Sequence, residues 1–290
     1  MIRYDVTEAD LRAAVAAIAP TWLDQAKART AAFIKAKRYN ETSGTWSAIK
    51  EAYMSLQANK CAYCERKLGG ARFSKVEHDV EHYRPKGNIR LWPSASDKAN
   101  RNINYGFPTG AAADNGYYWL AYHLLNYATA CKTCNSSLKK DCFPIAGKRG
   151  GAKKTPAQLR TVEKPFLVYP LGRLDADPED LITFVGVTPV PKTKSGAKHD
   201  RAMVTIDFFE LDTREELLYE RAELIAGLGL ALRNTNGQAK AAAKKLLAAA
   251  VKPAAPHSSC ARAYLKLEKT DPALAKAQWE AAVDYVGSHS

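Results

Sequence analysis

Four of the six cysteines form two pairs with the spacing of a metal site. Two residues separate Cys61 from Cys64, and the same spacing separates Cys131 from Cys134. Four thiolates suit a tetrahedral Zn²⁺ ion with bonds of about 2.3 Å and leave no position open for chemistry. The doubled pair therefore predicts one structural zinc ion that closes the intervening segment into a loop, with two unrelated cysteine pairs as the alternative.

Residues suited to hydrolysis lie between and beside these pairs. The segment between them contains the run Glu77-His78-Asp79-Val80-Glu81-His82-Tyr83-Arg84-Pro85-Lys86. Asn126 stands five residues before Cys131, and Asn135 follows Cys134 directly. A histidine titrates near neutral pH and is the side chain best suited to take a proton from water. Carboxylate and amide oxygens are the hard donors that Mg²⁺ prefers.

The order of these residues resembles that of the HNH (ββα-metal) endonucleases. The shared order is C-x2-C, an acidic residue with His and a nearby Pro, Asn before a second C-x2-C, then His or Asn, then Lys. The stretches CAYCE, DVEHYRPK, YYWLAYHLLN, ACKTCN and KKDCFP are similar to the HNH subfamily that includes the nuclease subunit of Septu-type antiphage systems and retron-linked nucleases. EKPFLVYP, ADPEDLITF and VTIDFFELD extend the similarity, which covers about residues 61–225.

The resemblance implies a metal-dependent endonuclease that hydrolyses phosphodiester bonds. It makes His82 the general base, Glu81 and Asn135 the ligands of a catalytic Mg²⁺ or Mn²⁺ ion, and Asn126 the residue that holds the histidine-bearing loop. Asn135 replaces the final histidine of the family name, a departure common in this subfamily that leaves the identity of the metal open. Contacts to phosphate are implied for four basic residues, Arg84, Lys86, Lys139 and Lys140.

Two other histidines are weighed against His82. His78 repeats the Glu-His dipeptide and shares one strand face with His82, so it is the rival for the same role. Pro85 and Lys86 follow His82 in the family order, which favours His82. His123 lies in an apolar run and is more simply a packed core residue. The five tryptophans are interpreted in the same way, as core or interface residues.

The charge of the chain favours a polyanionic partner. The formal net charge is +13, from 43 Lys and Arg against 30 Asp and Glu. Phosphate contacts release counterions, so a surplus of this size favours nucleic acid, although a solvated basic surface without function is an equal alternative. Eight bases, two acids and three glycines between Asn135 and Lys164 indicate a flexible basic loop.

The resemblance also bears on substrate and partners. HNH nucleases usually cut DNA, so DNA is expected over RNA, with tRNA as the alternative. Septu-like nucleases work with an ABC-type ATPase, and this chain carries no G-x4-G-K-[ST] loop of its own. A zinc-stabilised nucleic-acid-binding module without cleavage and a structural adaptor remain open, but Glu81, His82 and Asn135 together favour the nuclease.

Length and hydropathy bound the class of protein. A chain of 290 residues suits one large domain or two small ones. No run of about 18 apolar residues occurs, so no membrane span is expected. The first residues are charged and lack the apolar region of a signal peptide, which predicts a cytoplasmic protein.

The predicted fold is α+β, with a ββα-metal HNH core and a four-cysteine zinc knuckle embedded in mostly helical N- and C-terminal regions. The expected regions are a helical one at 1–60, the nuclease core at 61–145, subfamily-specific strands and a helix packed on the core at 146–225, and a helical one at 226–290. Apolar spacing over 7–57 predicts helices, the first capped by Thr7 with Asp10. A strand is expected over Val76 to Tyr83 and a helix beginning near Asn135.

The remaining segments complete this outline. Residues 90–115 are predicted to form a long loop because Asn, Pro, Gly and Ser are frequent there. Three runs between 163 and 211 are predicted as strands and loops: EKPFLVYPLG, ITFVGVTPV and AMVTIDFFEL. Thr213 with Glu216 is expected to cap the following helix. Asn236-Gly237 ends it, an Ala/Lys-rich helix follows to about Val251, and Asp271 before Pro272 starts the last helix.

Overall fold

The computed structural model describes residues 1–69, 78–234 and 236–289. The chain divides into two compact units. The first, here called the cleft unit, comprises Arg3–Ala62 and Leu68–Ala176, and the second, here called the helical unit, comprises Met1–Ile2, Tyr63–Lys67 and Asp177–Ser290. The expected regions 1–60 and 61–145 lie mostly in the cleft unit, and the expected boundary at 226 lies within a helix of the helical unit.

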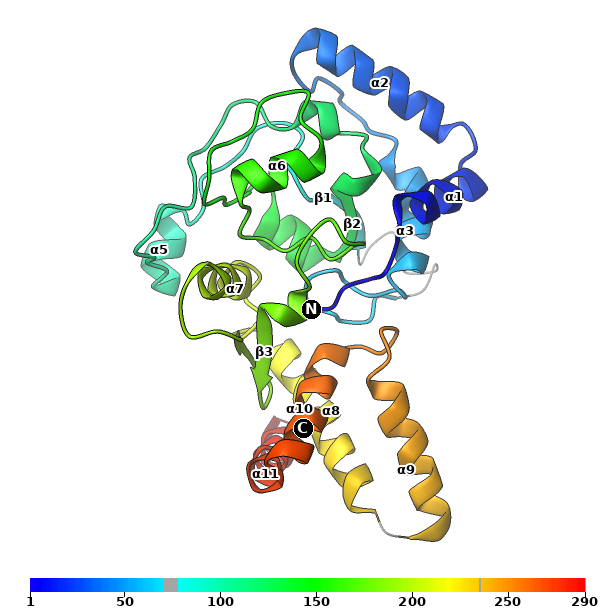
Figure 1. Cartoon of the computed structure of the whole chain (residues 1–290), viewed down its shortest axis with the longest axis vertical. Coiled ribbons are helices and arrows are strands. Elements are labelled where there is room, and N and C mark those ends of the chain that lie inside the picture. The colour runs from blue at the N-terminus through cyan, green and yellow to red at the C-terminus, as the bar shows by residue number, and fades with distance from the viewer. Residues whose placement is uncertain (70–77, 235, 290) are drawn as a thin grey trace. The chain divides into compact units, whose positions relative to one another are not determined.

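The cleft unit begins with helices. They are α1 (Glu8–Ile18), α2 (Trp22–Ala36), the short helix η1 (Trp46–Ile49) and α3 (Lys50–Leu56). The capping box predicted at Thr7 and Asp10 is confirmed, because each side chain accepts the backbone N–H of the other residue. α1 packs against α2 and α3, and α3 packs against strand β2, so these helices lie beside the strand pair (Figure 1).

The two strands of the cleft unit pair antiparallel although 44 residues of sequence separate them. β1 (His78–His82) pairs with β2 (Tyr127–Cys131), with His82 opposite Tyr127 and His78 opposite Cys131. The strand predicted from residue 76 is described from His78, and Val76 and Glu77 lie outside the described residues. The helix η4 (Thr133–Lys139) follows β2 directly, as expected near Asn135, but it is a π-helix, in which the N–H of Lys140 reaches the carbonyl of Asn135.

Two predicted loops in the cleft unit contain helices. Residues 90–115 include α5 (Ala95–Arg101), which Ser94 and Asp97 cap reciprocally. The basic segment predicted as a flexible loop contains η4 and α6 (Pro156–Glu163), capped by Thr155 and Gln158. In both cases the capping residues satisfy the first N–H groups of a short helix, a signal that the density of Gly, Pro and Ser obscured. Two further short helices, η2 (Tyr118–Leu120) and η3 (Leu124–Asn126), precede β2.

Buried tyrosines form much of the core of the cleft unit. Tyr53 and Tyr169 are buried, and each donates its hydroxyl to a backbone carbonyl: Tyr53 to that of Leu124 at 2.7 Å, and Tyr169 to that of Tyr127 at 2.9 Å. A buried hydroxyl without a partner costs free energy, so these contacts make the tyrosines compatible with the core. They also fix η3 and β2, the segments beside the candidate site.

In its described residues, the helical unit consists of a small hairpin, the short helix η5 and five longer helices. The elements are η5 (Pro178–Asp180), β3 (Ile182–Val185), β4 (Thr188–Pro191), α7 (Ala197–Phe208), α8 (Glu215–Arg233), α9 (Gly237–Ala250), α10 (Ser258–Thr270) and α11 (Pro272–His289). α8 packs against α9, α10 and α11 (Figure 1). Gly229 allows the close approach of α11, because a Cβ atom there would lie 2.0 Å from the Trp279 ring.

Some predictions for the helical unit are confirmed and others are wrong. The run ITFVGVTPV forms the β3–β4 hairpin, and Asp271 caps α11 through the N–H of Leu274 at 3.0 Å. AMVTIDFFEL was predicted among the strands and loops, but its first seven residues belong to α7. Its consecutive β-branched residues favour a strand locally, whereas the buried positions of the folded unit follow a helix face. Helix α8 starts at Glu215 after Arg214, not after Thr213, and has no side-chain cap.

The fold class is α+β, as predicted, with two small two-stranded sheets among helices. EKPFLVYPLG does not form a strand; it is irregular backbone that makes single bridges at Pro165 and Leu171, and its two prolines cannot donate to a sheet. Among the described residues, no helix combines the length and hydropathy needed to cross a membrane.

Candidate active site

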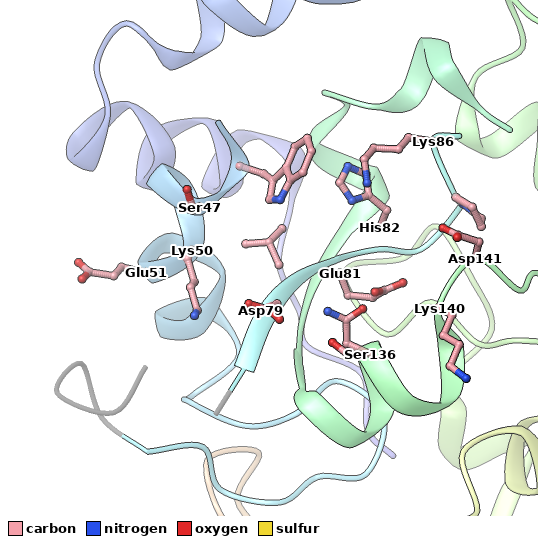
Figure 2. A pocket seen from close by; sticks show the side chains of 14 residues that line it. Ser47, Lys50, Glu51, Asp79, Glu81, His82, Lys86, Ser136, Lys140 and Asp141 are labelled. Carbon is pink, nitrogen blue, oxygen red and sulfur yellow. The ribbon is translucent and has the colours of Figure 1, made fainter. Parts of the chain in front are cut away.

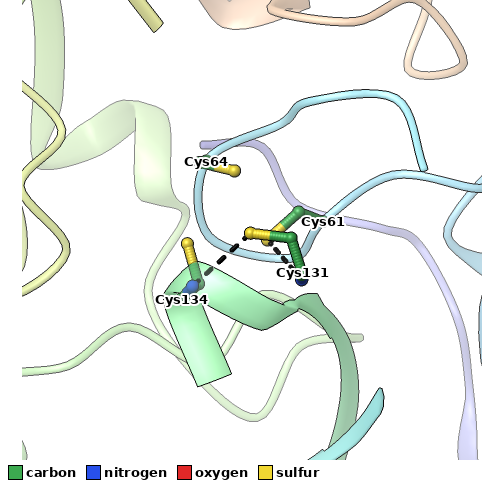
Figure 3. A group of neighbouring side chains, drawn as sticks. All are labelled: Cys61, Cys64, Cys131 and Cys134. Atoms are coloured by element: carbon green, nitrogen blue, oxygen red, sulfur yellow. Dashed lines mark hydrogen bonds between the residues drawn. The ribbon is translucent and has the colours of Figure 1, made fainter. Parts of the chain in front are cut away.

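The four paired cysteines lie together and are buried. Their Sγ atoms all lie within 4.8 Å of one another (Figure 3). A tetrahedral Zn²⁺ ion with bonds of about 2.3 Å needs sulfurs about 3.8 Å apart, so this cluster fits the ion. The N–H of Cys131 points at the sulfur of Cys61 at 3.4 Å, and the N–H of Cys134 points at that of Cys131 at 3.5 Å. Such donors stabilise thiolates, the form that binds a metal. The cluster is therefore able to hold zinc.

A cleft of about 530 Å³ lies in the cleft unit beside β1 and η4 (Figure 2). Its lining combines β1, the start of η4 and the first turns of the N-terminal η1–α3 segment. The residues are Trp46, Ser47, Lys50, Glu51, Asp79, Val80, Glu81, His82, Pro85, Lys86, Asn135, Ser136, Lys140 and Asp141. The cleft thus gathers Glu81, His82, Asn135, Lys86 and Lys140 of the predicted site residues.

His82 is held on several sides. Its Nε2 lies 3.1 Å from the carbonyl oxygen of Ala121, which also accepts the hydroxyl of Tyr127. Since a carbonyl only accepts, Nε2 carries the proton and Nδ1 is the ring atom able to accept one. The rings of Trp46 and Tyr127 meet the imidazole edge-on, with centroids at 4.8 and 4.9 Å. Burial, aided by the charge of Lys86, holds the pKa of His82 well below its usual range, so the imidazole is neutral.

Glu81 is buried and paired with a buried lysine. Its Oε1 lies 2.5 Å from Nζ of Lys139, and the same ammonium donates to the carbonyl of His82 at 2.8 Å. Burial raises the pKa of Glu81, and the positive charge of Lys139 opposes that shift. Lys139 therefore joins the end of η4 to β1 at the two candidate catalytic residues. It does not line the cleft, which differs from the phosphate contact predicted for it.

Asn126 fastens the chain that follows His82. Its Oδ1 accepts the N–H of Arg84 at 2.8 Å, and its Nδ2 donates to the carbonyls of Arg84 and Leu120 at 3.0 and 3.1 Å. Arg84 itself points into the interior, where its Nε donates to buried Glu163 at 3.1 Å. The phosphate contact predicted for Arg84 does not agree with this burial, because the guanidinium already pairs a buried carboxylate and lies outside the cleft lining.

Lys86 and Lys140 are the predicted phosphate contacts that lie at the cleft. The ammonium of Lys86 lies 4.6 Å from the ring centre of Trp46 and 5.3 Å from that of Tyr39. Partial burial lowers its pKa, and the carboxylates of Asp141 and Glu81 oppose the shift. The side chain of Lys140 is exposed and follows η4. The cleft therefore has two of the predicted lysines near His82 and Glu81, and the carboxylate of Asp141 lines it as well (Figure 2).

Other predicted residues have different surroundings. The side chain of His78, the rival base, lies outside what the structure describes. His123 accepts the N–H of Leu125 on Nδ1 at 3.1 Å and lines a separate cavity of about 320 Å³. This local hydrogen bond explains the position of the His123 side chain without a catalytic role.

Sequence reasoning missed one wall of the cleft. Trp46, Lys50 and Glu51 come from the N-terminal region, where the apolar spacing indicated only core faces. No motif marks them, so nothing in the sequence singled them out. Asp79 also lines the cleft and pairs with Lys132. Its position two residues before Glu81, on the same strand face, was the available signal for it.

Comparisons with known proteins find one distant relative. The chain is similar to the Septu protein PtuB of Bacillus mycoides (strain KBAB4), with 27% identity over 183 residues. The aligned part covers 63% of this chain and 52% of that protein, so the chain spans about half the length of the curated relative it matches. No family model and no solved structure matches the chain. The similarity supports a distant relationship to the Septu proteins.

Proposed function

We propose that this protein is a metal-dependent endonuclease of the HNH type that cuts DNA as part of an antiphage defence system. The observation that carries the proposal is the convergence of His82, Glu81 and Asn135 on one cleft, with His82 held as a neutral imidazole. Glu81 and His82 lie between the two cysteine pairs and Asn135 directly follows the second pair, an order that supports the same assignment. The distant similarity to a Septu protein supports the antiphage context.

The chemistry assigned to His82 is proton abstraction from water. Nδ1 of the imidazole takes the proton while the water oxygen forms a bond to phosphorus, and the bond from phosphorus to the leaving 3′-oxygen breaks. The Ala121 carbonyl, which accepts the Nε2 proton, stabilises the imidazolium that forms. Because its pKa is lowered, His82 is neutral at neutral pH and is able to accept a proton.

Glu81 and Asn135 are the proposed ligands of the catalytic ion. Both line the cleft, and their side chains supply carboxylate and amide oxygens, which suit Mg²⁺ or Mn²⁺. Such an ion supplies charge stabilisation for the phosphoryl oxygen and the leaving oxygen when bound. Lys139 pairs with one oxygen of Glu81, so its role is to position that carboxylate. Lys86 and Lys140 are the proposed phosphate contacts.

Cleavage assays on the whole chain test this function. Plasmid DNA, single-stranded DNA and tRNA are incubated with Mg²⁺ or Mn²⁺ and either the wild type or His82→Asn. We expect cleavage of DNA by the wild type and a loss of at least about a hundredfold in the variant, as for removal of a general base. His199→Ala is the matched control, because His199 lies on α7, outside the cleft lining.

The outcomes separate the alternatives. Equal cleavage by the wild type and His82→Asn would overturn the assignment of His82. Preferential cleavage of tRNA would replace DNA by RNA as the substrate. Binding of nucleic acid without cleavage under any condition would support the non-cleaving module instead.

An ABC-type ATPase is the proposed partner, on the strength of the family resemblance. The chain has no nucleotide-binding loop of the G-x4-G-K-[ST] type, so a nucleotide-driven signal must come from another protein. Affinity purification of the tagged full chain from its native host is expected to recover such an ATPase. Recovery of the tagged chain without any ATPase would count against this partner.

A further inference from the structure

A smaller cavity in the cleft unit is not used by the proposed reaction. It has a volume of about 220 Å³ and lies between the segments 115–119 and 149–152. Its lining includes Tyr118, Trp119, Arg149, Gly150 and Gly151. The volume is below the roughly 300 Å³ at which pockets for drug-sized ligands begin, so the cavity suits a single flat ring system.

Two aromatic rings form one side of this cavity. Tyr118 and Trp119 are both half-buried, with ring centroids 5.1 Å apart and planes at 80°. The indole N–H of Trp119 donates to the carbonyl of Lys154 at 3.0 Å, which fixes its ring. Partly exposed aromatic rings that are held in place are the usual platforms for nucleobases, because every base offers a π-face.

The lining also includes a fixed cation and open backbone. The guanidinium of Arg149 donates to the carbonyls of Ala111 and Phe143, with distances of 2.6 to 3.2 Å. These contacts hold its plane, which favours stacking or cation–π contact with a ring. A Cβ atom at Gly151 would have nothing within 4 Å, so this part of the lining is open to a ligand. Lys148 and Lys153 nearby are exposed and suit the attached phosphate.

The backbone that lines this cavity contacts the backbone that lines the cleft. The N–H of Tyr117 donates to the carbonyl of Pro85 at 2.7 Å, and Pro85 and Lys86 line the cleft. Gly116 packs so closely here that a Cβ atom would lie 2.3 Å from the carbonyl oxygen of Pro85 and 2.2 Å from that of Gly87. Because these backbone segments touch, a strand whose phosphate lies at Lys86 is close to this cavity, and its path to the cavity is part of the proposal below.

We propose that this cavity binds one unstacked nucleobase of a single-stranded nucleic acid. The proposal rests on the proposed function, since it extends the path of the substrate beyond the cleft. A duplex keeps its bases stacked and paired, so the cavity discriminates in favour of single-stranded segments or extruded bases. The substrate class that follows is nucleic acid with an unpaired stretch next to the cut.

Fluorescence anisotropy without added Mg²⁺ or Mn²⁺ tests the proposal on the full chain. A labelled twelve-nucleotide single strand and its duplex are titrated with the wild type, Tyr118→Ala and Tyr118→Phe. We expect Tyr118→Ala to weaken single-strand binding by about fivefold or more, the loss of one stacked base, and duplex binding by less than about twofold. Tyr118→Phe keeps the ring and is expected to bind like the wild type.

Two further variants guard against a folding artefact. Gly151→Glu adds a carboxylate in open space and is expected to weaken single-strand binding by repulsion of phosphate. Tyr285→Ala removes a half-buried aromatic ring from α11 and is expected to change nothing. Wild-type single-strand binding in both Tyr118→Ala and Gly151→Glu, or an equal loss of duplex binding, would overturn the proposal.

Two more experiments test whether the bound base belongs to a strand or to a free nucleotide, and whether base binding is independent of cleavage. Adenosine monophosphate is added as a competitor: displacement of the strand at equal nucleotide concentration would place a free nucleotide in the cavity and overturn the strand as ligand, whereas no displacement supports the strand. The Tyr118 comparison is repeated in His82→Asn, where the difference in binding is expected to persist. If the wild type cleaved no substrate, the proposed nuclease function would be refuted. The proposal of a base-binding cavity would still be decided by the binding measurements alone.

Discussion

At the scale of single residues, the candidate site depends on how one imidazole is held. His82 meets the carbonyl of Ala121, the ring of Tyr127 and the ring of Trp46. The first two contacts come from segments next to Asn126 in the sequence, but Trp46 comes from the N-terminal helices. The same indole carries the ammonium of Lys86 on its face, so Trp46 connects the proposed base with a proposed phosphate contact.

Trp46 is therefore expected to act as a positioning residue. Trp46→Ala removes the ring that orients His82, and a misplacement of about 1 Å can cost a hundredfold in rate. We expect kcat to fall about 10- to 100-fold, with Trp46→Phe restoring most of it. The measurement is steady-state cleavage as a function of substrate concentration.

Tyr39→Ala is the matched control for Trp46. Tyr39 contacts Lys86 and Trp46 but has no ring contact with His82. Its loss is expected to raise KM with little change in kcat. A fall in kcat of the same size in both variants would show that Trp46 has no special role in holding the base.

At the scale of elements, the strand pair and the helix after it position the site. β1 supplies Glu81 and His82, and η4 supplies Asn135 near its start and Lys139 at its end. The ion pair between Lys139 and Glu81 joins these elements at the site itself. Asn126 makes a second connection, because its side-chain amide accepts the backbone N–H of Arg84 and donates to the carbonyl of the same residue.

The fastening by Asn126 has a measurable effect on stability. Asn126→Ala leaves buried backbone groups of Arg84 and Leu120 without partners, at about 1 to 3 kcal/mol each when unsatisfied. We expect the free energy of unfolding to fall by about 2 to 4 kcal/mol in denaturant titrations. Asn126→Asp presents an oxygen to two carbonyls and is expected to be no better than alanine. Wild-type stability in both variants would contradict the stabilising role of the Asn126 hydrogen bonds.

The helical unit contains a buried histidine that makes stability depend on pH. Burial lowers the pKa of His257, and its hydrogen bond of 2.7 Å to Glu220 opposes that shift. A depressed pKa means that the folded state favours the neutral imidazole. Its stabilising contribution is present above the unfolded value of about 6.5 and is lost as the pH falls below it.

Denaturant unfolding at pH 7.5 and pH 5.0 tests this sign. The wild type is expected to lose more stability between the two values than His257→Gln, which has no group that titrates there. The difference between the two proteins isolates His257 from other acid-sensitive groups, including cysteine thiolates. Parallel pH profiles would show that His257 does not contribute.

At the scale of the whole molecule, the cysteine cluster joins segments far apart in the sequence. Cys61 and Cys131 are 70 residues apart, so a metal there closes a long loop. Structural zinc sites contribute on the order of 10 kcal/mol of apparent binding free energy, which is comparable to the whole stability of a typical domain. The cluster is therefore expected to determine whether the purified protein is folded.

Metal analysis is expected to find one equivalent of zinc per chain. Cys134→Ser should lose the zinc and melt at a markedly lower temperature, as should the wild type after exhaustive dialysis against a strong chelator. Cys142→Ser is the matched control, because Cys142 is buried but stands outside the cluster. If the protein kept its full stability after dialysis against the chelator, the metal would have no structural role.

The sequence by itself determined which residues are candidates for chemistry. The cysteine spacing predicted the cluster, and the order of Glu81, His82 and Asn135 predicted which residues to look for together. The structure places the cysteines in one cluster and these three residues at one cleft. The sequence is sufficient to select them because a motif is a local property, stated by the types and spacing of a few residues. The capping box at Thr7 was predictable for the same reason.

Only the tertiary structure decided what each charge and each apolar run does. Arg84 and Lys86 look alike in the sequence, yet Arg84 is buried against Glu163, 79 residues away, while Lys86 lies at the cleft. The run in α7 looks like a strand until its packing selects the helix. The burial and pairing of a side chain depend on partners that are distant along the chain. Burying a charge costs free energy, and whether that cost is compensated depends on those partners.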